Sequence, residues 1–256
     1  MIVKKNQNKK ELKTLCVIPA RGGSKSLKEK NIQLLFGKPL IHWPIKAALQ
    51  SNQIDEIFVY TDNKKIANEA LKAGASVPFM RADEISQDLT TTEETLKSAI
   101  VSYEQYVGYE FDIAVFLTCT DIFRKTEWID EAINILKENP KIESAFSVSE
   151  TYKNFWEVDD NGNPKRISSW MREYSNRQVR KKIYREDTGL ACASIAKLWR
   201  EGRRIGDKVI KIHFFCCFMQ HPASNGFRFE HFHVSIIIYL RNTTIVKNHS
   251  SMLNSL

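Results

Sequence analysis

Near its N-terminus the chain carries the stretch Leu15-Cys-Val-Ile-Pro-Ala-Arg-Gly-Gly-Ser-Lys-Ser-Leu-Lys-Glu-Lys-Asn31, and this stretch decides the fold. It opens with a short apolar run of the kind a buried strand needs and breaks at Pro19 into a loop. Gly22 and Gly23 let the backbone approach a ligand closely and point N–H groups at it. Four basic side chains surround the same concavity: Arg21, Lys25, Lys28 and Lys30. A loop of this composition after a first strand suits a triphosphate.

Two better-known phosphate loops do not fit this stretch. The P-loop needs a second glycine followed directly by Lys-Ser or Lys-Thr, and the dinucleotide fingerprint needs three spaced glycines. The next glycine after Gly23 is Gly37, so neither spacing is present.

Downstream of the loop, apolar strands alternate with amphipathic segments. The pattern predicts strands at 57–61, 76–79, 113–117 and 144–148. It predicts helices over 39–49, with a start or kink at Pro44, over 66–71, after the capping box Thr91-x-x-Glu94, and over 128–136. This alternation predicts an α/β fold with a mostly parallel sheet covered on both faces.

Polar residues gather where these strands end, which is where open α/β sheets bind ligands. They are Arg21, Thr61-Asp62, Arg81 and the segment 118–121. For three of them a structural role competes with a ligand role. Asp62 is as good a helix cap as a ligand, and Arg81 has Asp83 and Glu84 as ion-pair partners close by. Asp121 is a candidate metal ligand, with helix capping as the alternative.

Composition narrows the class of protein. The 256 residues are 43% hydrophobic, which is enough for one large α/β domain. The first 13 residues are polar and lysine-rich with no apolar core, so no secretory signal is predicted. The longest late apolar run, 234–240, is too short to span a bilayer, so no membrane partner is expected. The five cysteines are odd in number and not spaced for zinc, and the apolar surroundings of Cys16, Cys119 and Cys192 indicate buried thiols in a reducing cytoplasm.

The net charge of +8 is concentrated in one band. Residues 162–211 hold 14 Lys and Arg against 5 Asp and Glu, an excess of 9 that exceeds the total. Such a band suits nucleic acid, an anionic sugar and a nucleotide, or plain solvated surface. No nucleic-acid-binding motif accompanies it, so a nucleic-acid partner is not expected.

The chain divides into a polar extension at 1–13, a main domain at 14–211 and an atypical tail at 212–256. Within the main domain, residues 152–184 are rich in aromatic and basic side chains around the turn Asp159-Asp-Asn-Gly162, and they indicate an arm leaving the sheet. The tail holds five of the six histidines and Cys216-Cys217, in no standard zinc spacing.

The elements of the first loop, in order, resemble the signature loop of the acylneuraminate cytidylyltransferases, which activate sialic and related nonulosonic acids. These elements are Ala20-Arg21, Gly22-Gly23, Ser24-Lys25 and Lys30-Asn31. The resemblance continues, motif by motif, to residue 208. It implies a three-layer Rossmann-like nucleotide-diphospho-sugar transferase fold, with a small protruding dimerisation arm and a homodimer.

The resemblance also implies a reaction and a set of site residues. The anomeric hydroxyl of a nine-carbon sugar acid would attack the α-phosphate of CTP, giving a CMP-sugar and pyrophosphate, with Mg²⁺ as cofactor. Arg21 and Lys25 would act on the phosphates as the catalytic cations. The implied nucleotide-binding residues are Ala20, Arg21, Gly22, Gly23, Ser24, Lys25, Lys30, Asn31, Arg81 and Thr92. The implied substrate-binding residues are Thr118, Arg177, Arg185, Thr188 and Gly189.

The chain departs from the family pattern at several positions. Thr118 occupies the place of a glutamine, and Thr188-Gly189 occupies the place of an Asn-Gly turn. Cys192 stands where the family has a sugar-packing tyrosine. The family's late Asp-x-Asp metal segment is missing after Gly206-Asp-Lys-Val209, where Glu230 is the only acidic residue. The metal ligands are therefore unassigned, apart from Asp121 as a candidate.

Three alternatives stay open beside the nonulosonic acid cytidylyltransferase. One is a CTP-binding pseudoenzyme whose altered tail lacks the metal carboxylates. Another is a 3-deoxy-octulosonate cytidylyltransferase, a group that carries Ser-x-Arg where this chain has Ser24-Lys25. The third is a basic nucleic-acid-binding protein, whose affinity would fall steeply with salt.

Overall fold

The structure is a computed structural model, and it describes residues 11–213 except 25–26, 88, 174–175 and 177. The predictions for Lys25 and Arg177, and those for the tail beyond residue 213, therefore lie outside the described residues.

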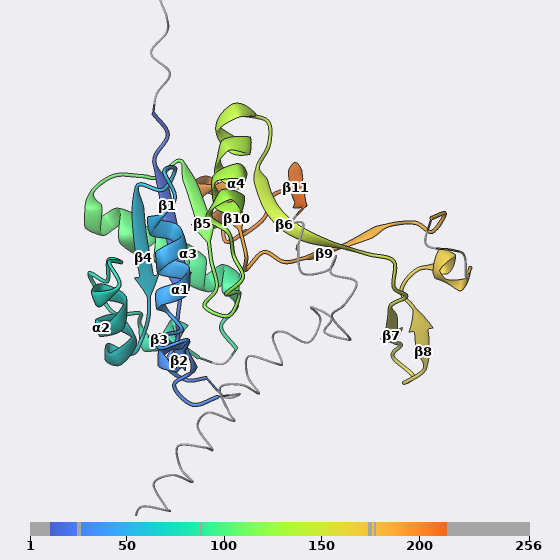
Figure 1. The fold of residues 1–256 in the computed structure, drawn as a ribbon, viewed down its shortest axis with the longest axis horizontal. Coiled ribbons are helices and arrows are strands. Elements are labelled where there is room, and N and C mark those ends of the chain that lie inside the picture. Colours follow the sequence, from blue (N-terminus) through green and yellow to red (C-terminus); the bar gives the residue numbers. More distant parts are fainter. Residues whose placement is uncertain (1–10, 25–26, 88, 174–175, 177, 214–256) are drawn as a thin grey trace, which may run out of the picture.

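One mixed sheet forms the centre of the molecule, with strand order β11-β6-β10-β5-β1-β4 (Figure 1). The strands are β1 (Thr14–Pro19), β4 (Glu56–Tyr60), β5 (Ile113–Phe116), β6 (Ser144–Thr151), β10 (Cys192–Ile195) and β11 (Val209–His213). β1 pairs in parallel with β4 and β5, whereas β10 runs antiparallel to both β5 and β6. The sheet is thus mostly parallel, as predicted.

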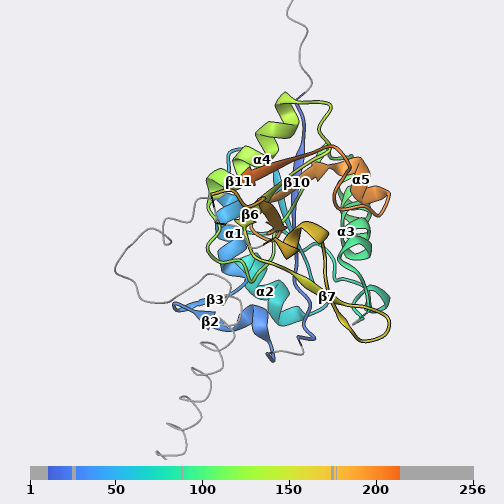
Figure 2. The same cartoon turned by 90° about the vertical axis from the view of Figure 1, so that its right-hand side faces the viewer.

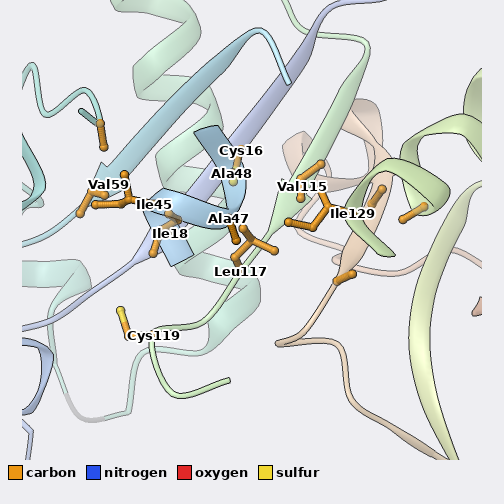
Figure 3. Packing of buried hydrophobic residues seen from close by; sticks show 14 of the residues in the cluster. Cys16, Ile18, Ile45, Ala47, Ala48, Val59, Val115, Leu117, Cys119 and Ile129 are labelled. Carbon is orange, nitrogen blue, oxygen red and sulfur yellow. The ribbon is translucent and has the colours of Figure 1, made fainter. Parts of the chain in front are cut away.

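Helices cover both faces of this sheet, which gives the three predicted layers (Figure 2). They are α1 (His42–Leu49), α2 (Lys64–Lys72), α3 (Thr92–Val107), α4 (Thr126–Glu138) and α5 (Ala196–Arg200). The side chains of β1 alternate between two cores: Ile18 packs with α1 and α4, while Val17 packs with α3 and α5. Figure 3 shows Ile18, Ile45 and Val115 in the first of these cores.

Three cysteines lie in these cores as free thiols, in agreement with the prediction that they are buried. Burial raises the pKa of each thiol to about 12, so the three stay protonated at neutral pH. They are Cys16, Cys119 and Cys192.

The predicted helix boundaries match the structure best where the interacting residues are close in sequence. The capping box is present: the Glu94 N–H donates to Thr91 Oγ1 at 3.1 Å, and the Thr91 N–H donates to Glu94 Oε2 at 2.7 Å. The helix predicted from residue 39 begins at His42, because Pro44 is tolerated in a first turn. The strand predicted at 76–79 is reduced to one bridge between Phe58 and Ser76.

The predicted arm leaves the sheet at the end of β6 (Figure 1). β6 continues to Thr151 and pairs there with antiparallel β9 (Ile183–Glu186). Beyond them, β7 (Trp156–Val158) and β8 (Pro164–Arg166) form a hairpin, followed by the 3₁₀ turn η3 (Ser169–Arg172).

Short elements frame the rest of the fold. They are the 3₁₀ turns η1 (Lys30–Ile32) and η2 (Asp83–Ile85) and the hairpin of β2 (Leu34–Leu35) and β3 (Lys38–Pro39). β11 extends to His213 and buries Ile212, so residues 212–213 belong to the sheet and not to the tail. Among the helices of the described part, none is long and apolar enough to cross a membrane.

Candidate nucleotide-binding site

The carboxyl ends of β1, β4 and β5 meet at one edge of the sheet, because the three strands are parallel neighbours. Antiparallel β10 begins at the same edge, so the turn before it arrives beside them. This arrangement brings residues 20–24, 61–63, 118–121 and 188–189 together from four separate parts of the chain.

The loop after β1 is fixed at both ends. The Ala20 N–H donates to the Tyr60 carbonyl at 3.0 Å, and the Asn31 side-chain amide donates to the Arg21 carbonyl at 3.0 Å. Asn31 is buried, and Lys30 opens the η1 turn outside the pocket described below. Asn31 therefore closes the base of the loop in this structure, and the nucleotide-binding roles of Lys30 and Asn31 stay predictions.

Gly22 approaches the end of β4 closely. Its N–H donates to Asp62 Oδ1 at 2.7 Å, and a Cβ added at this position would lie 2.9 Å from Asn63 Cβ. The amide of Gly22 is thus engaged by a carboxylate in this structure, and its role toward a phosphate stays a prediction. Gly23 has open space around its Cα, and the Ser24 N–H donates to the Gly22 carbonyl at 2.9 Å.

Asp62 does not cap the helix that follows it. The N-cap of α2 is the next residue, Asn63, whose Oδ1 accepts the N–H groups of Lys65 and Ile66 at 2.9 and 3.2 Å. Asp62 accepts the Gly22 N–H instead. Burial lowers the pKa of Arg81, and the negative charge of Asp62 opposes part of that lowering.

A pocket of about 270 Å³ opens beside this loop. Four of its lining residues were predicted as site residues: Arg21, Arg81, Thr92 and Thr118. The other lining residues are Pro19, Gln87, Thr90, Thr95 and Phe116. The pocket thus combines two guanidinium groups with several hydroxyls at the edge of the sheet.

Arg81 is held rigidly in the wall of the pocket. It is only 6% exposed, and its Nη2 donates to Thr95 Oγ1 at 3.0 Å and to the Ile85 carbonyl. Among the described residues it forms no ion pair with Asp83 or Glu84. Its Nε is buried without a hydrogen-bond partner in this part of the chain. Burial lowers the pKa of Arg81, and the nearby charge of Arg21 lowers it further, which marks the pocket as a place that favours an anion.

The Thr118 end of the pocket depends on a close contact with the turn before β10. The Thr118 hydroxyl donates to Asp121, and a Cβ at Gly189 would overlap Asp121 and lie 2.7 Å from Thr118 Oγ1. Arg124 ties the two segments together, since its guanidinium donates to the carbonyls of Thr118 (2.9 Å), Leu190 (2.5 Å) and Gly189. Burial lowers the pKa of Arg124 to about 10.

The remaining predicted substrate residues lie in two places. Thr188 is buried beside this turn, and its Oγ1 accepts a hydrogen bond from Arg204 Nη1 at 2.9 Å. Arg185 lies on β9 with 48% of its side chain exposed and pairs with Asp187 at 3.0 Å, and it does not line the pocket. Arg177 and Lys25 fall outside the described residues.

Sequence reasoning missed several residues of the site. Phe116 ends a buried strand, so its place at the pocket edge could be read from the rule that already selected Thr118. Thr95 follows the capping box by one position, but only the fold shows that it holds Arg81. Gln87 and Thr90 carry no local signal.

No described residues form a ready-made metal site, because no three His, Cys, Asp or Glu side chains come together among them. The two carboxylates at the site are separately engaged, Asp62 by the Gly22 N–H and Asp121 by the Thr118 hydroxyl. These residues fit a cation that is held mainly by a bound nucleotide.

The fold and the pocket together define an α/β protein with a cationic pocket at the carboxyl edge of its sheet. The sequence profile of the family described as cytidylyltransferase matches residues 15–236, so the chain belongs to this family. The match extends past the predicted boundary at residue 211.

Curated relatives agree with the resemblance to the acylneuraminate cytidylyltransferases. The chain is 42% identical over 155 residues to the CMP-N,N'-diacetyllegionaminic acid synthase of Legionella pneumophila, covering 59% of this chain and 66% of that protein. It is 44% identical over 89 residues to a pseudaminic acid cytidylyltransferase of Campylobacter jejuni, covering 35% and 38%. It is 37% identical over 156 residues to an N-acylneuraminate cytidylyltransferase of Streptococcus agalactiae, covering 59% and 36%. The matches thus span between about a third and two thirds of these relatives.

Solved structures support the fold. One is CMP:2-keto-3-deoxy-manno-octonic acid synthetase complexed with CTP, with a TM-score of 0.57, 17% identity, and coverage of 79% of this chain and 90% of that one. Another is the 4-diphosphocytidyl-2C-methyl-D-erythritol synthase of Anaerococcus prevotii, with a TM-score of 0.57, 14% identity, and coverage of 90% and 97%. At these identities the likeness concerns the fold alone.

Proposed function

We propose that this protein is a CTP-dependent nucleotidyltransferase that activates a nonulosonic acid of the sialic, legionaminic or pseudaminic type. The anomeric hydroxyl of the sugar acid attacks the α-phosphate of CTP, and pyrophosphate leaves. The observation that carries the proposal is the pocket between the β1 loop and Arg81, where Arg21 and Arg81 lie close enough for one charge to affect the other.

The geometry supports a reaction driven by positioning and charge. Phosphoryl-type transfer needs little covalent help from the protein, so preorganised cations supply most of the stabilisation. The Arg81 guanidinium is held by Thr95, and the backbone at Arg21 is held by Asn31, so the Arg81 charge and the path of the loop are set before charge develops. Ser24 and Lys25 are proposed as phosphate contacts from the family resemblance, and Thr92 offers a hydroxyl at the pocket wall.

Mg²⁺ is proposed to arrive with CTP. Mg²⁺ is usually held by one or two carboxylates together with substrate phosphates, so a protein cage is not needed. Asp62 is the carboxylate at the loop, and Asp121 is the carboxylate at the Thr118 end. When bound, the cation would disperse the charge of the leaving pyrophosphate.

The test is pyrophosphate release from CTP and Mg²⁺ with N,N'-diacetyllegionaminic, pseudaminic and N-acetylneuraminic acids. The chain should turn over at least one of them, and Arg21→Gln should reduce the rate by about 10²-fold or more. Lys38→Gln is the matched control, because Lys38 is exposed on the β2–β3 hairpin and its loss removes the same charge.

Other outcomes select the alternatives. CTP binding without pyrophosphate release from any acid would indicate the pseudoenzyme, the alternative raised by the missing Asp-x-Asp segment of the tail. Release only with 3-deoxy-octulosonate would indicate the octulosonate transferase. No binding of CTP at all would overturn the proposal.

We also infer a homodimer formed through the arm and a cytoplasmic location. Several apolar side chains of the arm are exposed, among them Val158 at 72% and Trp156 and Ile167 above half. Apolar patches of this kind mark interaction surfaces. The location rests on the free thiols of the described cysteines, which suit a reducing compartment, and on the use of CTP.

Sedimentation velocity tests the dimer. Val158→Glu should shift the protein toward monomer, because it places a charge in the apolar contact. Leu71→Glu, at an exposed apolar position on α2, should leave the mass unchanged. A monomeric parent protein, or equal effects of both variants, would contradict the inferred interface.

A further inference from the structure

Arg204 lies at the edge of the candidate site and has no role in the sequence prediction. It belongs to the turn between α5 and β11, far along the chain from the β1 loop. Its Nη1 donates to Thr188 Oγ1 at 2.9 Å, and its guanidinium lies 5.5 Å from the centre of the Phe116 ring. Phe116 lines the pocket, and Thr188 precedes the glycine that abuts Thr118.

The charge of Arg204 is incompletely matched. Its side chain is only 21% exposed, and its Nε is buried with no hydrogen-bond partner among the described residues. The nearest carboxylate is Glu93, whose Oε1 lies 3.4 Å from that Nε but is itself 42% exposed. A pair of this kind contributes little, whereas burying a guanidinium with an unmet donor is costly.

The neighbouring arginine provides a contrast. Arg203 is 44% exposed, and its Nη2 pairs with Asp207 at 2.9 Å. Two adjacent arginines of the same basic band thus differ: one is a solvated surface ion pair, and the other is turned onto an aromatic ring and a buried hydroxyl at the pocket.

We propose that Arg204 is a substrate-binding residue that recognises the carboxylate of the sugar acid at the Thr188 end of the pocket. This inference rests on the proposed function. The planar guanidinium matches a carboxylate in geometry, and the unmet Nε donor together with Nη would serve as its fork. The Phe116 ring, whose centre lies 5.5 Å from the guanidinium, adds a cation–π contact.

Arg204 also complements the residues named from the sequence. Arg185 was assigned to the sugar carboxylate, and its guanidinium pairs with Asp187; neither Arg185 nor Arg204 is among the residues that line the pocket. Arg204 supplies a cation next to Thr188 and Gly189, the two predicted substrate residues that the structure does place beside Thr118.

The experiment compares Arg204→Gln, Arg204→Lys and the control Arg203→Gln in steady-state kinetics at saturating Mg²⁺. Arg204→Gln should raise KM for the sugar acid about 10- to 100-fold, the range expected for loss of a hydrogen bond to a charged group, and change KM for CTP by less than threefold. Arg204→Lys should fall between, because it keeps the charge but loses the fork. Arg203→Gln should match the parent protein.

A substrate whose carboxylate is esterified tests the proposed contact with Arg204 directly. The parent protein should prefer the free sugar acid over its methyl ester, and Arg204→Gln should lose most of that preference. A purely structural role would instead lower the melting temperature and leave the preference intact, which would overturn the assignment.

The failures of the two proposals are distinguishable. Parent turnover with an unchanged KM in Arg204→Gln rejects only the Arg204 assignment. If the parent protein releases no pyrophosphate, the proposed function fails, and calorimetric titration with N-acetylneuraminic and N,N'-diacetyllegionaminic acids in the presence of CTP decides on Arg204. Binding that weakens in Arg204→Gln supports it, and equal or absent binding rejects it.

Discussion

Replacing Gly22 with alanine tests whether the β1 loop must touch the end of β4. An added Cβ would lie 2.7 Å from Asn63 Nδ2 and 2.9 Å from Asn63 Cβ, both inside van der Waals contact. The neighbouring Gly23→Ala is the matched control, since nothing lies within 4 Å of its added Cβ. Both changes add one methyl group to the same loop, so only the contact differs.

Two relaxations of the clash are available, and each has a cost. If Asn63 moves, α2 loses its N-cap, which is worth about 1 kcal/mol. If the loop moves, the hydrogen bond from the Gly22 N–H to Asp62 is lost, at about 1.5–3 kcal/mol for a charged acceptor. We therefore expect Gly22→Ala to lower the free energy of unfolding by about 1–3 kcal/mol, the usual range for overpacking.

The assay combines thermal unfolding with CTP kinetics. At about 2–4 °C per kcal/mol for a chain of this size, Gly22→Ala should lower Tm by roughly 2–12 °C, and Gly23→Ala should lower it by less than Gly22→Ala does. A displaced loop should also reduce kcat/KM for CTP by about 10-fold or more, since small misplacements of binding groups are costly. Equal Tm and equal kcat/KM in the two variants would refute the reasoning.

Three further predictions concern the surrounding structure. Gly189→Ala should push apart the contact with Asp121 and lower kcat by about 10-fold or more in the pyrophosphate assay, and unchanged kcat would show that the contact is not needed. Thr91→Ala should lower the free energy of unfolding by about 1 kcal/mol in urea titration through loss of the capping box with Glu94, and a stability equal to the parent's would contradict this. The three buried thiols have a pKa of about 12 when folded and about 8.5 when unfolded, so their contribution to stability is full below pH 8.5 and declines toward pH 12. The urea midpoint should accordingly be lower at pH 10 than at pH 8, and a midpoint that rises would reject this linkage.

The sequence predicted the structural features that depend on residues close together in the chain. The apolar run after Thr14, the breaks at strand ends and the capping box at Thr91 are local patterns, and each appears in the structure. The pocket edge followed from a topological rule, because parallel strands place their carboxyl ends side by side. Arg21, Arg81 and Thr118 were selected in this way.

Contacts between residues far apart in the chain limit what the sequence alone can predict. Asp62 and Asn63 are both good N-caps by residue type, and only the approach of Gly22, 40 positions earlier, decides that Asn63 takes the cap. Within the basic band, Arg203 and Arg204 are indistinguishable by composition. Their difference depends on Phe116 and Thr188, which a single sequence cannot place next to them.

The reversed direction of β10 has a consequence for how the protein is made. β10 inserts between β5 and β6, so a growing polypeptide that has emerged only to residue 150 exposes the facing edges of both strands. Unpaired edges invite intermolecular pairing, which makes this the aggregation-sensitive interval of synthesis. The edge of the sheet beside the pocket is completed last, because Thr188, Gly189 and Arg204 are translated after every residue that lines the pocket.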